Sequence, residues 1–117
     1  MERLQGACHC RNIRYEAELD LTQPAIECNC SHCEMKGFLL QFVPVEKFEL
    51  LQGDEELMTY RFNTHVIEHR FCGDCGVEPF GMGKDTEGKS VVAINLRTID
   101  GVDLAAVTRA PYDGRSA

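Results

Sequence analysis

Cys28-Asn29-Cys30-Ser31-His32-Cys33 lies between two shorter motifs, Cys8-His9-Cys10 and Cys72-Gly73-Asp74-Cys75-Gly76. Together the three motifs hold all 7 cysteines of the 117-residue chain. Cysteines with only one or two residues between them make poor disulfides, because a bridge needs separated residues with matching Cβ geometry. They make good metal ligands, because two such thiolates can both reach one tetrahedral ion at about 2.3 Å. The spacing therefore predicts zinc binding rather than a disulfide framework.

The cysteines divide most simply into a group of four and a group of three. The outer motifs supply a closed Cys₄ set of the structural kind: Cys8, Cys10, Cys72 and Cys75. The middle motif supplies a set that leaves one position of a tetrahedral ion vacant, as in catalytic zinc sites: Cys28, Cys30 and Cys33. We therefore expect two zinc ions per chain. Counting does not prove this partition, since the middle motif can also share a site with either pair.

A histidine would close the second site if it reached the metal. His32 lies inside the motif, and His9 or His69 can approach it in space, so any of them would complete a Cys₃His set and make this a second structural site. We expect instead an open position, with His32 pointing away from the ion and His69 packing or lying at the surface, on the same face as His65.

Cys72 and Cys75 also have the spacing of a redox dithiol. Thioredoxin-like redox function expects this pair in a βαβ context. The hydrophobic pattern offers no such context, because no amphipathic helix of twelve residues can be drawn. A redox role is therefore disfavoured.

The same pattern indicates a mainly β protein with short connections. Residues 13–19 alternate apolar and polar, which is typical of a half-buried strand, and the apolar run within 90–96 is typical of a central one. We expect further strands just before Cys28 and over 38–43, 48–51, 57–62 and 66–71. A zinc knuckle at 72–76 should start the next arm, which passes Pro79-Phe80 into the Gly-rich stretch 81–84. The connections include a loop or helical turn at 31–37, a turn at Asn63-Thr64-His65 and one helical turn at 103–107.

Length, charge and hydropathy limit the remaining possibilities. The length suits one domain covering residues 1–117. A net charge of −7 with no basic cluster argues against a nucleic-acid partner, whose binding depends on clustered Lys and Arg. No apolar run is long enough for a bilayer, and the N-terminus lacks the pattern of a signal peptide. We expect no membrane association and a cytoplasmic location, where thiols are kept reduced.

The order of the cysteine motifs resembles the glutathione-dependent formaldehyde-activating enzyme family, which includes centromere protein V. The resemblance rests on 6–10, on 28–33 with Gly37, and on 70–76, with further matches at 62–64, 95–101 and 112–115. It implies a β-tent fold of several small coiled antiparallel sheets. It also implies a structural zinc at the group of four and a second zinc at Cys28, Cys30 and Cys33.

The resemblance further implies carbon–sulfur lyase chemistry, the condensation of formaldehyde with glutathione to S-hydroxymethylglutathione. A thiol that enters an open zinc position ionises, because zinc favours thiolate over thiol. The sequence thus predicts a zinc-dependent enzyme acting on a glutathione, or other thiol, adduct of a small aldehyde, with Cys28, Cys30 and Cys33 at the catalytic centre. The alternative is a non-catalytic two-zinc β module that serves as a protein-interaction scaffold.

Overall fold

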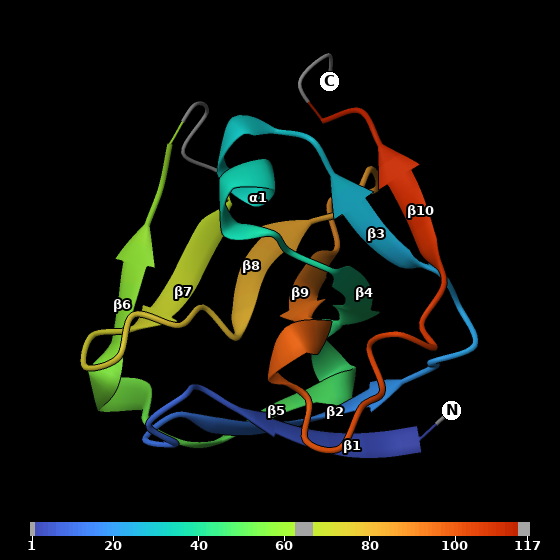
Figure 1. Cartoon of the computed structure of the whole chain (residues 1–117). Helices are drawn as coiled ribbons and strands as arrows, with labels where there is room; N and C mark the ends of the chain where they lie inside the picture. Colours follow the sequence, from blue (N-terminus) through green and yellow to red (C-terminus); the bar gives the residue numbers. More distant parts are fainter. Residues whose placement is uncertain (1, 63–66, 115–117) are drawn as a thin grey trace.

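The computed structural model describes residues 2–62 and 67–114, and strands dominate these ranges (Figure 1). The strands are β1 Glu2–Ala7, β2 Arg14–Leu19, β3 Ala25–Cys28, β4 Leu40–Pro44, β5 Phe48–Gln52, β6 Leu57–Tyr60, β7 Glu68–Cys72, β8 Phe80–Lys84, β9 Ser90–Asn95 and β10 Arg109–Tyr112. The helices are α1 Ser31–Lys36 and the 3₁₀ turns η1 Val45–Lys47, η2 Asp54–Glu56 and η3 Leu96–Thr98. The expected mainly β fold is confirmed.

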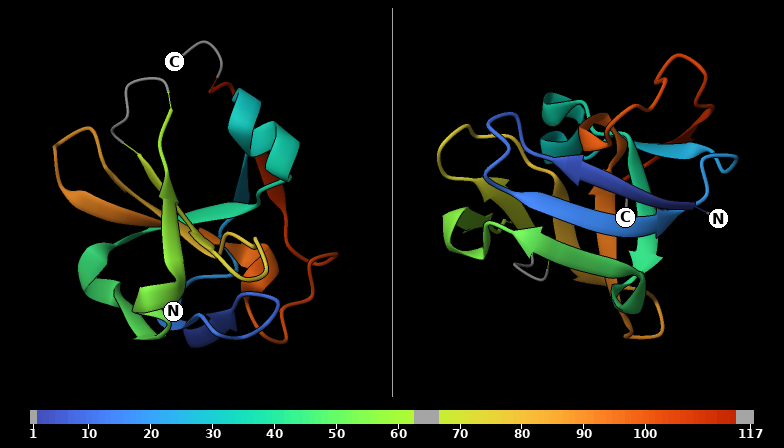
Figure 2. Two further views of the ribbon diagram at one scale, coloured as in Figure 1. Left: turned by 90° about the vertical axis from the view of Figure 1, so that its left-hand side faces the viewer. Right: turned by 90° about the horizontal axis from the view of Figure 1, so that it is seen from below.

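The strands form two sheets of unequal size. The smaller has the order β1-β2-β5, and the larger has the order β10-β3-β4-β9-β8-β7-β6. Seen from below, the small sheet lies across the strands of the large one (Figure 2), and α1 lies at the opposite end of the molecule (Figure 1). Neighbouring strands run antiparallel except β10 and β3, which are parallel, so the large sheet is mixed.

The core fills the space between the two sheets. β2 alternates as its sequence predicts, and its buried residues Tyr15, Ala17 and Leu19 share one cluster with Val92 and Ile94 of β9. β9 is the middle strand of the large sheet; Val92 and Ile94 are buried on one face, and Val91 and Ala93 are half-buried on the other, which fits its continuous apolar run. This packing holds the small sheet against the end of the large sheet away from α1.

The sequence pattern does not predict two of the strands, β1 and β10. β1 carries few apolar residues, and β10 contains Pro111, which has no N–H for a sheet ladder. β10 tolerates this proline because it is an edge strand, the position in which sheets accept proline. The parallel register of β10 with β3 places Tyr112 beside Cys28.

The expected helical turn at 103–107 is wrong. There the Asp103 side chain accepts a hydrogen bond from the Ala105 N–H at 3.1 Å, and its carbonyl accepts one from Ala106 at 3.0 Å. An aspartate that bonds to the backbone two residues ahead favours a turn over a helix. The expected turn at Asn63-Thr64-His65 lies outside the described residues. No helix in the described ranges is long and apolar enough to cross a membrane.

Candidate metal centres

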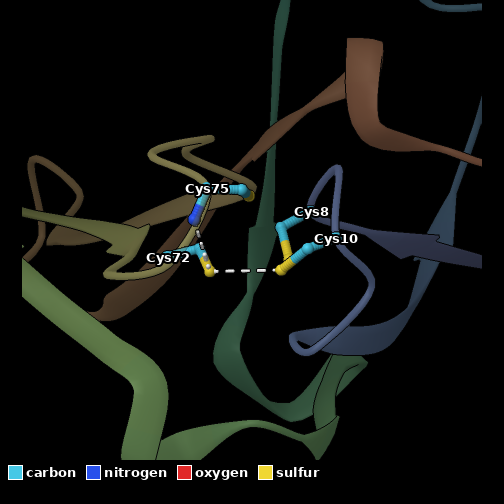
Figure 3. A group of neighbouring side chains, drawn as sticks. All are labelled: Cys8, Cys10, Cys72 and Cys75. Atoms are coloured by element: carbon cyan, nitrogen blue, oxygen red, sulfur yellow. Dashed lines mark hydrogen bonds between the residues drawn. The ribbon is translucent and has the colours of Figure 1, made fainter.

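The four cysteines of the outer motifs meet at the edge between the two sheets (Figure 3). Their sulfur atoms all lie within 4.8 Å of one another. Cys10 Sγ lies 3.6 Å from Cys8 Sγ and 3.7 Å from Cys72 Sγ. The edge of a sulfur tetrahedron with 2.3 Å bonds is about 3.8 Å long. The donor set and its spacing therefore fit a zinc ion, and all seven cysteines of the chain are free thiols.

Backbone N–H groups surround the sulfurs of this group. The loop after β1 carries Cys8, whose sulfur accepts from the Ile13 N–H at 3.3 Å. The loop after β7 turns around Cys72, whose sulfur accepts from Asp74 at 3.3 Å and from Cys75 at 3.4 Å. Such donors favour the thiolate over the thiol. Burial acts to raise the pKa of Cys75, but bonds from the backbone at Cys10 and Val77 outweigh it and lower that pKa to about 6.

Cys28, Cys30 and Cys33 form a second sulfur cluster at the other end of the large sheet. Cys28 ends β3, Cys30 precedes α1, and Cys33 lies in the first turn of α1. The sulfur of Cys30 caps the helix, because it accepts from the Cys33 N–H at 3.3 Å. The three sulfurs lie within 4.8 Å of one another, and among the described residues no fourth His, Cys, Asp or Glu belongs to this cluster. We call it the cysteine trio.

The C-terminal segment covers one side of the trio. Tyr112 pairs with Cys28 in the sheet, and its carbonyl accepts from the Asn29 N–H at 3.0 Å. The chain then passes Cys28 so closely that a side chain at Gly114 would overlap the Cys28 sulfur. The C-terminal segment therefore forms one wall of the trio.

A third group of metal-ligating residues lies next to α1, and sequence reasoning did not predict it. His32, His69 and Glu78 place their ligand atoms within 4.8 Å of one another. His69 Nδ1 lies 2.9 Å from Glu78 Oε2, and the two imidazole centres are 4.1 Å apart. His32 thus belongs to this group and not to the trio, although its chain neighbour Cys33 is a trio member. We call the group the His–Glu cluster.

Aromatic rings enclose the His–Glu cluster. The imidazole of His32 packs against Phe38, Tyr60 and Phe62, with ring centres 5.4 to 5.7 Å apart. Burial, helped by the nearby charges of His69 and Lys36, lowers the pKa of His32 to about 4. His32 is therefore neutral at pH 7, the form in which imidazole binds a metal. His69 is buried, one of the two positions expected for it, while His65 lies outside the described residues.

Two further residues position these groups. Arg97 donates from Nε to the carbonyl of Gly37 at 2.7 Å, where Gly37 ends α1 in the left-handed conformation. Asn95 is buried and donates to the backbone carbonyl of Glu78 at 3.0 Å. Both lie in the segment 95–101 that contributes to the family resemblance, which is the sequence signal that could have singled them out.

A pocket of about 340 Å³ opens beside the His–Glu cluster. Its lining consists of His32, Lys36, Tyr60, Phe71, Gly76 and Glu78. Gly76 directly follows Cys75 of the four-cysteine group, and His32 lies in α1 next to the trio member Cys33. The wall of the pocket therefore includes chain neighbours of both cysteine clusters. The pocket thus lies next to the metal-ligating residues.

The fold and its two cysteine clusters define a small β protein with two groups of thiols that could hold metal ions. A crystal structure of a protein from Rhodobacter sphaeroides is similar, with a TM-score of 0.81 and 26% identity over 92% of this chain and 98% of that one. The family model for glutathione-dependent formaldehyde-activating enzymes matches residues 3–112. The chain therefore belongs to this family, and the resemblance seen in its motifs is confirmed.

Proposed function

We propose that this protein is a zinc-dependent enzyme that makes or breaks the carbon–sulfur bond of a thiol adduct of a small aldehyde. Its family supports a glutathione-related, formaldehyde-activating role. The observation that carries the proposal is the cysteine trio, which offers three sulfur ligands and, among the described residues, no fourth His, Cys, Asp or Glu. Three protein ligands with one position left over characterise catalytic zinc sites, whereas four characterise structural ones.

In this proposal the two cysteine clusters divide the work. Cys8, Cys10, Cys72 and Cys75 hold a structural zinc that joins the β1–β2 loop to the β7–β8 loop. Cys28, Cys30 and Cys33 hold the second ion and form the catalytic centre. A zinc ion at the trio would supply a coordination position at which a substrate thiol ionises near neutral pH. The chain would thus carry two zinc ions.

Other residues of the chain stabilise negative charge on the trio sulfurs and maintain the spacing of the trio, which prepares it for a substrate thiol. The helix N-terminus at Cys30 and the N–H of Cys33 favour negative charge on sulfur. Correspondingly the pKa of Cys30 is lowered, because hydrogen bonds from Cys33 outweigh the effect of burial. Gly37 and Arg97 hold the other end of α1, so Cys30 and Cys33 keep their separation.

The proposed reaction needs only the thiol and the aldehyde as reactants. In the forward direction the thiol sulfur attacks the aldehyde carbon, a carbon–sulfur bond forms, and the carbonyl oxygen takes up the proton that the thiol gave up. The product is a hydroxyalkyl thioether such as S-hydroxymethylglutathione. In reverse, the oxygen loses its proton, the carbon–sulfur bond breaks, and the thiolate leaves.

Glutathione binding to the cobalt-substituted protein tests this proposal. We expect added glutathione to change the visible spectrum of the cobalt ion at the trio and to raise thermal stability, by about 2.7 kcal/mol at a concentration of 100 times the dissociation constant. S-methylglutathione is the matched control ligand, because its sulfur cannot ionise, and it should change neither. Exchange between formaldehyde, glutathione and the adduct, followed by NMR, should then be faster with enzyme than without it.

The same experiment separates this function from the protein-interaction scaffold. One observation favours the scaffold function, because exposed apolar side chains can contact a protein partner. The large apolar side chains that are exposed include Met35, Phe42, Met58, Tyr60, Ile67 and Tyr112. A cobalt spectrum that stays unchanged in millimolar glutathione, together with no acceleration of adduct exchange, would overturn the enzymatic proposal and favour the scaffold.

A further inference from the structure

The buried carboxylate of Glu78 lacks part of the hydrogen bonding that a buried charge needs. Its side chain is only 4% exposed, and Oε1 has no hydrogen-bond partner. A buried carboxylate is costly unless a cation or several hydrogen bonds compensate it. Glu78 lies between Val77 and Pro79, just before β8 begins at Phe80.

The described residues provide no lysine or arginine for this carboxylate. The ion-pair contacts of Glu78 are with His69 Nδ1 at 2.9 Å and His32 Nε2 at 3.9 Å. The ring of His32 also has an unpartnered buried atom, Nδ1. Two imidazoles and one carboxylate therefore share a space in which a carboxylate oxygen and a ring nitrogen both lack partners.

The separations are those of ligands to one ion. Two ligands with bonds of about 2.1 Å lie about 3.0 Å apart at a right angle and about 4.2 Å apart when opposite. Glu78 Oε2 lies 2.9 Å from His69 Nδ1 and Glu78 Oε1 lies 3.9 Å from His32 Nε2, distances close to or within this range. The longer one exceeds a hydrogen bond, so hydrogen bonding alone does not explain the approach of His32.

We propose that His32, His69 and Glu78 form a third metal site, separate from both cysteine clusters, for a divalent first-row transition ion. The two imidazoles suit Zn²⁺ or Fe²⁺, the carboxylate also suits the harder Mn²⁺, and the set leaves further positions for water or for an oxygen ligand. This set contains no sulfur, so it differs in preference from the cysteine sites. The inference does not depend on the reaction proposed for the trio.

Neighbouring residues leave room for the ion and access to it. Gly81 faces the cluster across β7 and β8, and a Cβ there would lie 3.9 Å from both His69 Nδ1 and Glu78 Oε2. The Asn95 amide anchors the backbone of Glu78 from the other side. His32 and Glu78 also line the 340 Å³ pocket, so an ion at this site would be reachable by a small ligand.

Manganese binding to the zinc-loaded protein tests the site. With the cysteine clusters filled by Zn²⁺, added Mn²⁺ should bind with one ion per chain, measured as loss of the free Mn²⁺ signal in electron paramagnetic resonance. A third equivalent of Zn²⁺ should compete for the same site. Glu78→Gln and His69→Gln should each weaken Mn²⁺ binding at least about tenfold, because each removes one ligand.

Matched measurements keep the result independent of folding and of the proposed enzyme. Glu87→Gln makes the same charge change at an exposed residue and should bind Mn²⁺ like the wild type. Retention of two tightly held zinc ions in each variant shows that the fold is intact. Failure of the zinc-loaded protein to bind either Mn²⁺ or a third Zn²⁺, or equal Mn²⁺ affinity in Glu78→Gln and wild type, would overturn the site, whatever the outcome of the glutathione experiment.

Discussion

The backbone of Gly114 lies against the sulfur of Cys28, although 86 positions separate the two residues in the chain. The parallel pairing of β10 with β3 brings them together, since Tyr112 is the register partner of Cys28. The end of the described chain thus forms part of the wall of the cysteine trio. A site assembled from residues 28–33 alone would lack this wall.

Gly114→Ala should therefore disturb the trio. Its Cβ would overlap the Cys28 sulfur and lie 3.2 Å from the Cys30 Cβ, so either the C-terminal segment or the sulfur must move. We expect the affinity of the trio for zinc to fall roughly tenfold or more, as measured by competition with a chelating dye. Gly83→Ala is the control, because its Cβ makes only an ordinary contact of 3.7 Å with Ile67. Equal zinc affinity in both variants would show that the close approach has no consequence.

Serine substitutions should separate the two cysteine clusters. Cys72 is fully buried and packs with Cys8 and Ile13, so Cys72→Ser should remove a zinc ion that contributes to folding and should unfold much of the chain. Cys30 is partly exposed, and Cys30→Ser should lose one zinc ion and any activity while keeping the fold. Circular dichroism and metal content measure both effects. Equal collapse of the two variants would mean that both sites are structural.

Stepwise metal removal offers a test without mutation. A strong chelator should remove one zinc ion quickly, because a three-sulfur site with a free position is open to attack by an incoming ligand. The second ion should leave more slowly and together with loss of structure. We expect two kinetic phases in zinc release, with the change in circular dichroism confined to the slower one. Release of both ions in a single phase would contradict this division.

Tyr15→Phe should measure a bond that ties the small sheet to the segment after β9. Thr98 Oγ1 donates to the Asn95 carbonyl at 2.7 Å, so the Tyr15 hydroxyl donates to Thr98 Oγ1, also at 2.7 Å. Losing this buried hydrogen bond should lower the free energy of unfolding by about 1 kcal/mol in denaturant titrations. Tyr60→Phe, at a ring that is 48% exposed, should change stability far less.

Gly6→Ala probes the same contact from the other strand. A Cβ at position 6 would overlap the Tyr15 ring and lie 2.7 Å from the Thr98 carbonyl oxygen. Because the ring is fully buried and cannot retreat, we expect a loss of at least about 2 kcal/mol, measured by the same titration. A smaller loss than that of Tyr15→Phe would show that β1 can shift away from β2 at little cost.

Much of the fold could be predicted from local pattern. The alternation of β2 and the apolar run of β9 are properties of consecutive residues, and they predicted strands that the structure contains. β1 and β10 were missed because their residues are exposed or include proline. For an edge strand the partner's hydrogen bonds, and not its own hydrophobicity, determine the structure.

For the candidate site, the sequence by itself determined the sulfur chemistry, because cysteines with only one or two residues between them must lie close together in any fold of the chain. Counting favoured one partition of the cysteines without proving it, and only the tertiary structure brings Cys8 and Cys10 to Cys72 and Cys75 and lays Gly114 on Cys28. The tertiary structure also buries Glu78 between His32 and His69, an arrangement that no local sequence pattern predicts. Contacts between distant segments depend on strand pairing and core packing, and those are properties of the whole chain.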